Sequence, residues 1–198
     1  MTHRITLSGE QAKCVEVLTL SSQLGLELVS FSPEPEDYLD FKVFISYRRN
    51  DSADIAGRIY DHLIWELGHY SAFLDVESIP AGNAWQPILI EQASSCTMML
   101  AIIGNDWLTS TDEDGNQRLF QDDDFVRLEL SIALARANVS VIPILIQDAE
   151  MPKRNELPEN IQALAGRQIL ELRSGVHFRK DVQALIDEVK SQFDNLKE

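Results

Sequence analysis

Cysteine is nearly absent from this sequence, and histidine is sparse. The two cysteines, Cys14 and Cys96, lie far apart in apolar surroundings, which fits neither a disulfide framework nor a zinc site. The four histidines are scattered, and none has a cysteine, histidine or carboxylate partner at the spacing of metal ligands. We therefore expect a reducing compartment and no bound metal.

Long hydrophobic runs and excess positive charge are also missing. The longest apolar run, residues 98–104, is far too short to cross a bilayer, and the N-terminus lacks the pattern of a signal peptide. Acidic residues outnumber basic ones by 32 to 17, for a formal charge of −15. Such a surface repels nucleic-acid phosphates and anionic membranes. These absences predict a cytoplasmic protein that binds neither nucleic acid nor membrane.

The common motifs of nucleotide-binding and acyl-transfer enzymes do not occur. No G-x-G-x-x-G follows an expected strand, and there is no G-x-x-x-x-G-K-[ST] phosphate loop. No G-x-S-x-G nucleophile elbow is present. A response-regulator receiver needs an acidic pair after its first strand, where this sequence has SYRR. The sequence therefore excludes these four classes.

The composition is that of a globular protein, with 44% hydrophobic and 25% charged residues among 198. Residues 30–40, SFSPEPEDYLD, contain two prolines among acidic residues and are typical of a linker. The residues before it show a capping-box pattern at Ser8 and Gln11, but they are too few to form an independent core. We expect an N-terminal extension with an acidic, proline-containing linker at 1–40 and one domain at 41–198.

After the linker, apolar segments alternate with amphipathic ones. Strands are expected at 41–47, 71–75, 97–104, 139–147 and 168–172. Helices are expected at 51–67, 86–95, within 121–137, at 157–165 and at 178–196. Asp51 or Ser52 is expected to cap the first helix, and Pro143 interrupts the bonding pattern of the fourth strand. The alternation predicts an α/β fold with an open, mainly parallel five-stranded sheet and helices on both faces.

In such a sheet, ligands bind beyond the carboxyl ends of the strands, where the strand order reverses. For a flavodoxin-like order, that point lies between the first and third strands. The loops there, 46–52 and 104–115, carry Tyr47, Arg48 and Trp107. Loops are ordinarily polar, so the interest lies in their convergence with the third helix.

The third helix contains one central carboxylate, Glu129, four residues after Phe125 and on the same helical face. The side chains expected to face the sheet are Leu128, Ile132 and Ala135. A glutamate in this position is ordinarily solvated or ion-paired. A buried, unpaired carboxylate instead indicates function, and the helix pattern leaves both interpretations open.

Four segments carry a family resemblance: FKVFISYRRNDS, FLDVESIPAGNAW, IIGNDWLTSTDEDGNQRLFQDDDFVRLEL and VIPILI. In this order they look like the first strand, the second strand with its loop, the third strand through third helix, and the fourth strand of a bacterial Toll/interleukin-1 receptor (TIR) domain. The resemblance covers residues from about 41 to 190. It implies a flavodoxin-like sheet in the order 2-1-3-4-5.

The resemblance also implies an activity. Many bacterial TIR domains cleave the nicotinamide–ribose bond of NAD+ with a glutamate in a W-x-x-x-E pattern of the third helix. The matching segment is FVRLE, in which Phe125 replaces the tryptophan and Glu129 is the acid. We therefore expect an NAD+ glycohydrolase or ADP-ribosyl cyclase, with NAD+ as substrate and no other cofactor, acting in bacterial anti-phage signalling. The product is ADP-ribose or a cyclic isomer.

Given the resemblance, we also expect substrate-binding roles for other residues, namely Tyr47, Arg48, Asp75, Ile79, Trp85, Trp107 and Phe125. Tyr47 and Arg48 are alternatively caps of the first helix, and the two tryptophans are alternatively packing residues. The loop 76–85 is expected to pack against a neighbouring subunit, so that self-association completes the site.

Two other functions stay open. Some TIR domains are non-catalytic protein–protein interaction modules, which would use the 76–85 loop and tolerate changes at Glu129. A nucleoside deoxyribosyltransferase-like enzyme also cleaves an N-glycosidic bond with one essential glutamate.

Overall fold

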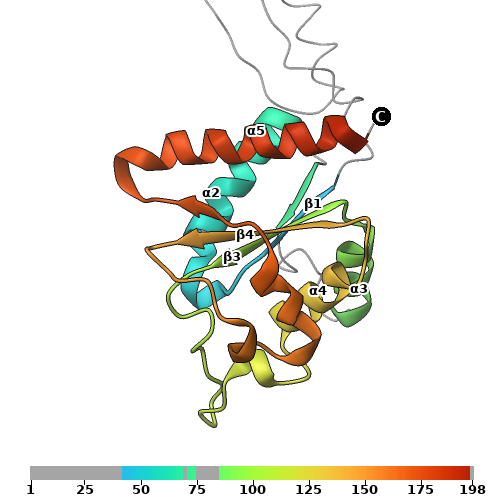
Figure 1. Cartoon of the computed structure of the whole chain (residues 1–198), viewed down its shortest axis with the longest axis vertical. Coiled ribbons are helices and arrows are strands. Elements are labelled where there is room, and N and C mark those ends of the chain that lie inside the picture. The colour runs from blue at the N-terminus through green and yellow to red at the C-terminus, as the bar shows by residue number, and fades with distance from the viewer. Residues whose placement is uncertain (1–41, 69–70, 75–84, 197–198) are drawn as a thin grey trace, which may run out of the picture. The chain divides into compact units, whose positions relative to one another are not determined.

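Five short apolar segments form one parallel sheet (Figure 1). The computed structural model describes residues 42–68, 71–74 and 85–196, with side chains described from residue 90 onward in the third of these ranges and up to residue 195. The strands are β1 (Val43–Ser46), β2 (Ala72–Leu74), β3 (Met98–Ile103), β4 (Ser140–Ile146) and β5 (Leu170–Leu172). Their order is β2-β1-β3-β4-β5, and every neighbouring pair is parallel. The expected flavodoxin-like order is thus confirmed.

The central strands are buried on both faces, as parallel strands covered by helices must be. All six residues of β3 are buried, and so are all four of β1. Pro143 lies inside β4, opposite Ala101 of β3. The pairing of β4 with β5 begins only at Ile144, so Pro143 lies before the paired part of that edge.

In the described part of the chain, four α-helices connect and cover the strands. They are α2 (Arg49–Leu67), α3 (Trp85–Ser95), α4 (Phe125–Leu134) and α5 (Phe178–Leu196). Shorter 3-10 helices are η3 (Arg118–Phe120), η4 (Arg154–Glu156), η5 (Glu159–Gly166) and η6 (Gly175–His177). The helix expected at 157–165 is therefore the 3-10 helix η5, which follows Pro158.

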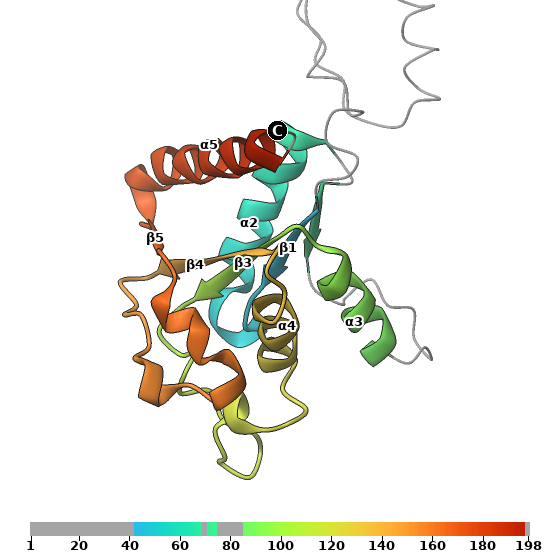
Figure 2. The same cartoon turned by 45° about the vertical axis from the view of Figure 1, so that its right-hand side comes forward.

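The helices form two layers, with α2 and α5 on one side of the sheet and α3 and α4 on the other (Figures 1 and 2). Each layer has its own core. Ile59 of α2 and Val182 of α5 pack in the first, and Ala93 of α3 and Leu130 of α4 in the second. The side chains of β1 alternate between these cores, as a strand requires: Ile45 faces α2 and α5, whereas Phe44 faces α3 and α4.

The first helix begins differently from the expectation that Asp51 or Ser52 caps it. The residue before α2 is Arg48, whose side chain makes no capping bond, and Asp51 lies within the first helical turn. The Asp51 carboxylate instead accepts hydrogen bonds from backbone N–H groups of Gly104 (3.0 Å) and Asp106 (2.9 Å). The prediction was wrong because the helix begins at Arg49, two residues earlier than expected. The Asp51 carboxylate is therefore inside the helix, where it binds backbone N–H groups of a distant loop.

The N-terminal extension and linker, residues 1–40, lie outside the described residues. Within the described part of the chain, every helix is too short or too polar to span a bilayer.

Candidate active site

Glu129 is buried in the α4 layer, although it is charged. The residue is 3% exposed, and its Oε2 accepts a hydrogen bond of 2.6 Å from the Ser46 hydroxyl. Ser46 is the last residue of β1, a central strand, and α4 follows β3, the neighbour of β1. The carboxylate therefore lies at the carboxyl end of the sheet where the strand order reverses, which is the expected ligand-binding position.

The alternation of β1 explains this contact. Phe44 points into the core between the sheet and α4, so Ser46, two residues later, points to the same side. A hydroxyl and a carboxylate buried together satisfy each other, whereas either alone would lose its hydrogen bonds to water at a cost of roughly 2 kcal/mol or more.

The side of α4 that faces the sheet differs from the prediction. The buried residues of α4 are Val126, Glu129, Leu130 and Ala133. Leu128 and Ile132, expected to face the sheet, are only half-buried, and Ala135 is exposed. Because α4 also packs against α3 and η5, its apolar residues occur on several sides, and the pattern alone did not identify the inner one.

Arg48 ties the start of α4 to the end of β1. Its guanidinium donates two hydrogen bonds to the Asp124 carboxylate, of 2.9 and 3.1 Å, and its Nε donates one of 2.8 Å to the backbone carbonyl of Trp107. The Arg48 and Asp124 side chains are 5% and 1% exposed. Asp124 also caps α4, since its Oδ1 accepts from the Arg127 N–H at 3.0 Å. One buried ion pair thus fixes the helix that carries Glu129.

The predicted aromatic residues lie in different surroundings. Tyr47 is 8% exposed and packs in the core on the α2 and α5 side. Trp107 is 1% exposed within the opposite core. Phe125 is half-buried at the first position of α4, one turn before Glu129. Of these rings, only Phe125 shares a helical face with the carboxylate.

The remaining predicted residues cannot be placed beside Glu129. Asp75 and Ile79 lie outside the described residues, as does nearly all of the 76–85 loop. Trp85 is the first residue of α3, and its side chain lies outside the described part. Their binding roles stay predictions.

Sequence reasoning missed Ser46 and Asp124, although a signal existed for each. Ser46 is a polar residue on the inner face of a buried strand, which the two-residue period of FKVFISY reveals. Asp124 directly precedes the first apolar residue of α4, which is the preferred position of an N-cap aspartate.

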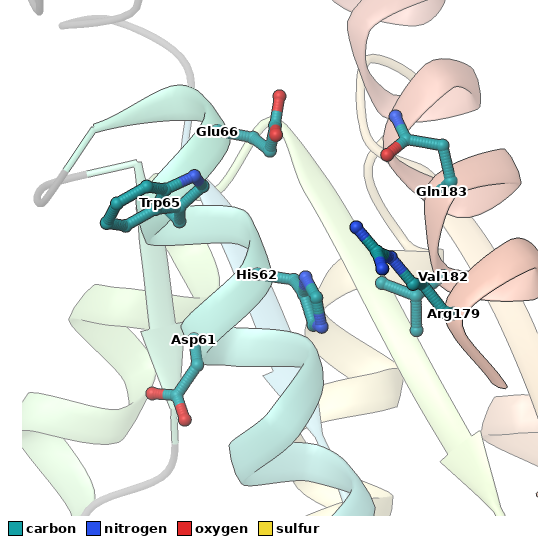
Figure 3. A pocket seen from close by; sticks show the side chains of 7 residues that line it. All are labelled: Asp61, His62, Trp65, Glu66, Arg179, Val182 and Gln183. Atoms are coloured by element: carbon teal, nitrogen blue, oxygen red, sulfur yellow. The ribbon is translucent and has the colours of Figure 1, made fainter. Parts of the chain in front are cut away.

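A hollow lies between α2 and α5, on the side of the sheet opposite to α4 (Figure 3). It has a volume of about 370 Å³ and is lined by acidic and basic side chains. Trp65, which also lines it, is 57% exposed. One of its walls is fixed by an ion pair of 2.7 Å between Glu66 and Lys190. It shares no residue with the Glu129 site.

Among the described residues, no cluster of histidine, cysteine and carboxylate side chains could hold a metal ion.

Comparison with known proteins identifies the family. The TIR domain family model matches residues 43–186, so this chain belongs to the TIR domain family. NAD(+) hydrolase sarm1 of Drosophila melanogaster is 31% identical over 128 residues, which cover 62% of this chain and 8% of that protein. The matched region is therefore a small part of that relative.

A solved structure supports the fold. The TIR domains of the activated Roq1 resistosome, which directly recognizes the pathogen effector XopQ, match with a TM-score of 0.57. The match covers 75% of this chain and 99% of that chain at 15% sequence identity, so it shows the fold alone.

Proposed function

We propose that this chain is an NAD+ glycohydrolase or ADP-ribosyl cyclase that uses Glu129 to cleave the nicotinamide–ribose bond. The observation that carries the proposal is the buried Glu129 carboxylate, 3% exposed, at the point where the strand order reverses. Side chains at that end of an open α/β sheet are placed to contact a bound ligand. The similarity to an NAD(+) hydrolase over 128 residues supports this choice of substrate.

The chemistry suits a single carboxylate. Nicotinamide in NAD+ is a cationic leaving group that departs neutral, so its expulsion needs no general acid. As the bond to C1′ breaks, positive charge develops on the ribose, as it does in glycoside hydrolysis. A fixed negative charge beside that carbon stabilises the transition state more than the substrate, and this difference accelerates the reaction. Water attack then gives ADP-ribose, and attack by a nucleophile within the ADP-ribose moiety gives a cyclic isomer.

Phe125 suits the role of an aromatic contact with the nicotinamide or its ribose, because it lies half-buried one turn from Glu129. Arg48 suits a second role beside the predicted contact with the substrate. Three of its hydrogen bonds already go to Asp124 and to Trp107, so we assign it to holding α4 in place.

The proposal includes self-association through the 76–85 loop to complete the site, and a role in bacterial anti-phage signalling. Both rest on the family resemblance.

The test is nicotinamide release from NAD+ by the purified full chain over a range of protein concentrations, with products separated by chromatography. Glu129→Gln should abolish release. Glu66→Gln is a matched control, because Glu66 is a half-buried, ion-paired glutamate on the opposite side of the sheet. Intact NAD+ at all concentrations, with a 76–85 loop variant that loses self-association, would favour the non-catalytic module. Cleavage of free nucleosides in place of NAD+ would favour a deoxyribosyltransferase-like enzyme.

A further inference from the structure

We infer that Ser46 is a positioning residue that holds the Glu129 carboxylate in its reactive orientation. The inference rests on the proposed function and adds a residue to that site. It derives from the hydrogen bond of 2.6 Å between the Ser46 hydroxyl and Glu129 Oε2, which joins residues 83 positions apart.

The length and the surroundings of this bond indicate a charge-assisted interaction. Hydroxyl–carboxylate bonds of about 2.5 to 2.7 Å are typical of an ionised acceptor. Ser46 is 1% exposed and Glu129 is 3% exposed, so little water competes for either group. Such a bond is about twice as strong as one between neutral groups, so it can hold the carboxylate in one orientation.

The hydroxyl is also attached to a rigid support. β1 is paired with β2 on one side and with β3 on the other, and Ser46 is in register with Ala101 of β3. A donor on a central strand moves little. A glutamate side chain has three rotatable bonds and samples several rotamers unless a contact fixes it. Ser46 thus supplies a fixed point for a flexible side chain.

A serine at this position has no evident packing advantage. Phe44, two residues earlier on the same side of β1, is fully buried in the α3 and α4 core. An apolar residue at position 46 would extend that core, but it would leave the Glu129 carboxylate without this donor. The hydroxyl is explained by the carboxylate that it contacts.

The experiment measures steady-state NAD+ cleavage by full-length Ser46→Ala, Ser46→Cys and Ser46→Thr. Loss of orientation should lower kcat of Ser46→Ala by about 10- to 100-fold with KM changed less than about threefold, because a displacement of about 1 Å can cost that much. Cysteine fills the space with a weak donor and should stay slow. Threonine keeps the hydroxyl and should recover most of the rate.

Ser71→Ala is the matched control. Ser71 is 2% exposed and donates a hydrogen bond of 2.6 Å to the Gly68 carbonyl, next to the opposite end of the sheet. This variant should lose some thermal stability and keep its kcat.

The outcomes separate the two claims. A Ser46→Ala protein with wild-type kcat, or a Ser46→Cys protein that recovers fully, overturns the positioning role and leaves the proposed function intact. If Ser46→Thr does not fold, the kcat values of Ser46→Ala and Ser46→Cys decide, because a positioning role predicts that both variants stay slow. A wild-type chain that cleaves no NAD+ at any concentration refutes the proposed function and this inference with it.

Discussion

The buried ion pair between Arg48 and Asp124 should contribute strongly to stability, and Asp124→Asn measures it. Asparagine has the shape of aspartate and caps helices equally well, so the bond from the Arg127 N–H is kept. What is lost is the negative charge beside a guanidinium that is 5% exposed, and with it the Arg48 hydrogen bond to Oδ2, because the amide NH2 in that place can only donate. Removing one partner of a buried pair typically costs about 3 to 5 kcal/mol.

The assay is urea unfolding followed by circular dichroism. With a dependence on urea of about 2 kcal/mol per molar, a loss of about 4 kcal/mol moves the midpoint down by about 2 M. Asp181→Asn is the control, since Asp181 pairs with Arg173 in similar two-bond geometry, of 2.9 and 2.7 Å, where water screens the charges. Its midpoint should move clearly less.

A second variant tests the cause. Arg48→Met together with Asp124→Asn removes both charges, so the double variant should lose less stability than the sum of the single variants. If Asp124→Asn is no worse than Asp181→Asn, or if the double variant is fully additive, the ion pair does not anchor α4 as we describe.

Two further predictions concern other contacts. Gly104→Ala should lower the free energy of unfolding by about 1 to 3 kcal/mol, because a Cβ there would lie 2.6 Å from Asp51 Oδ1. Gly57→Ala, in helix α2 with open space around the new Cβ, should not destabilise, and equal effects in urea unfolding would refute the argument. The hydrogen bond from Arg173 lowers the pKa of Asp181 from 3.8 to about 2. The stability that this provides is present above pH 3.8 and lost as the pH falls towards 2, so Asp181→Asn should remove that part of the acid dependence of the thermal midpoint; an unchanged acid limb would contradict it.

Local patterns predicted the elements well. The apolar run at 97–104 became β3, and the amphipathic segment at 178–196 became α5 with the same limits. Period and length determine such elements, so a single sequence contains them. The strand order came from the family resemblance, and the structure has it.

The candidate site was predicted only in part, because its contacts join distant positions. Glu129 was singled out from its motif, but its partner Ser46 is 83 residues away. The substrate-binding role of Arg48 stays a prediction, and the contact of its guanidinium with Asp124, 76 residues later, was not foreseen. Residue types limit which partners are possible, and only the packing of β1 against α4 selects one of them.

The central claim is that the Glu129 carboxylate cleaves NAD+, and the initial rate of nicotinamide release at saturating NAD+ tests it most directly. We predict that Glu129→Gln, with a thermal unfolding midpoint and a degree of assembly like those of the wild type, is slower by about a hundredfold to a thousandfold, as expected when a preorganised charge is removed. Comparable rates for the two proteins would contradict the account.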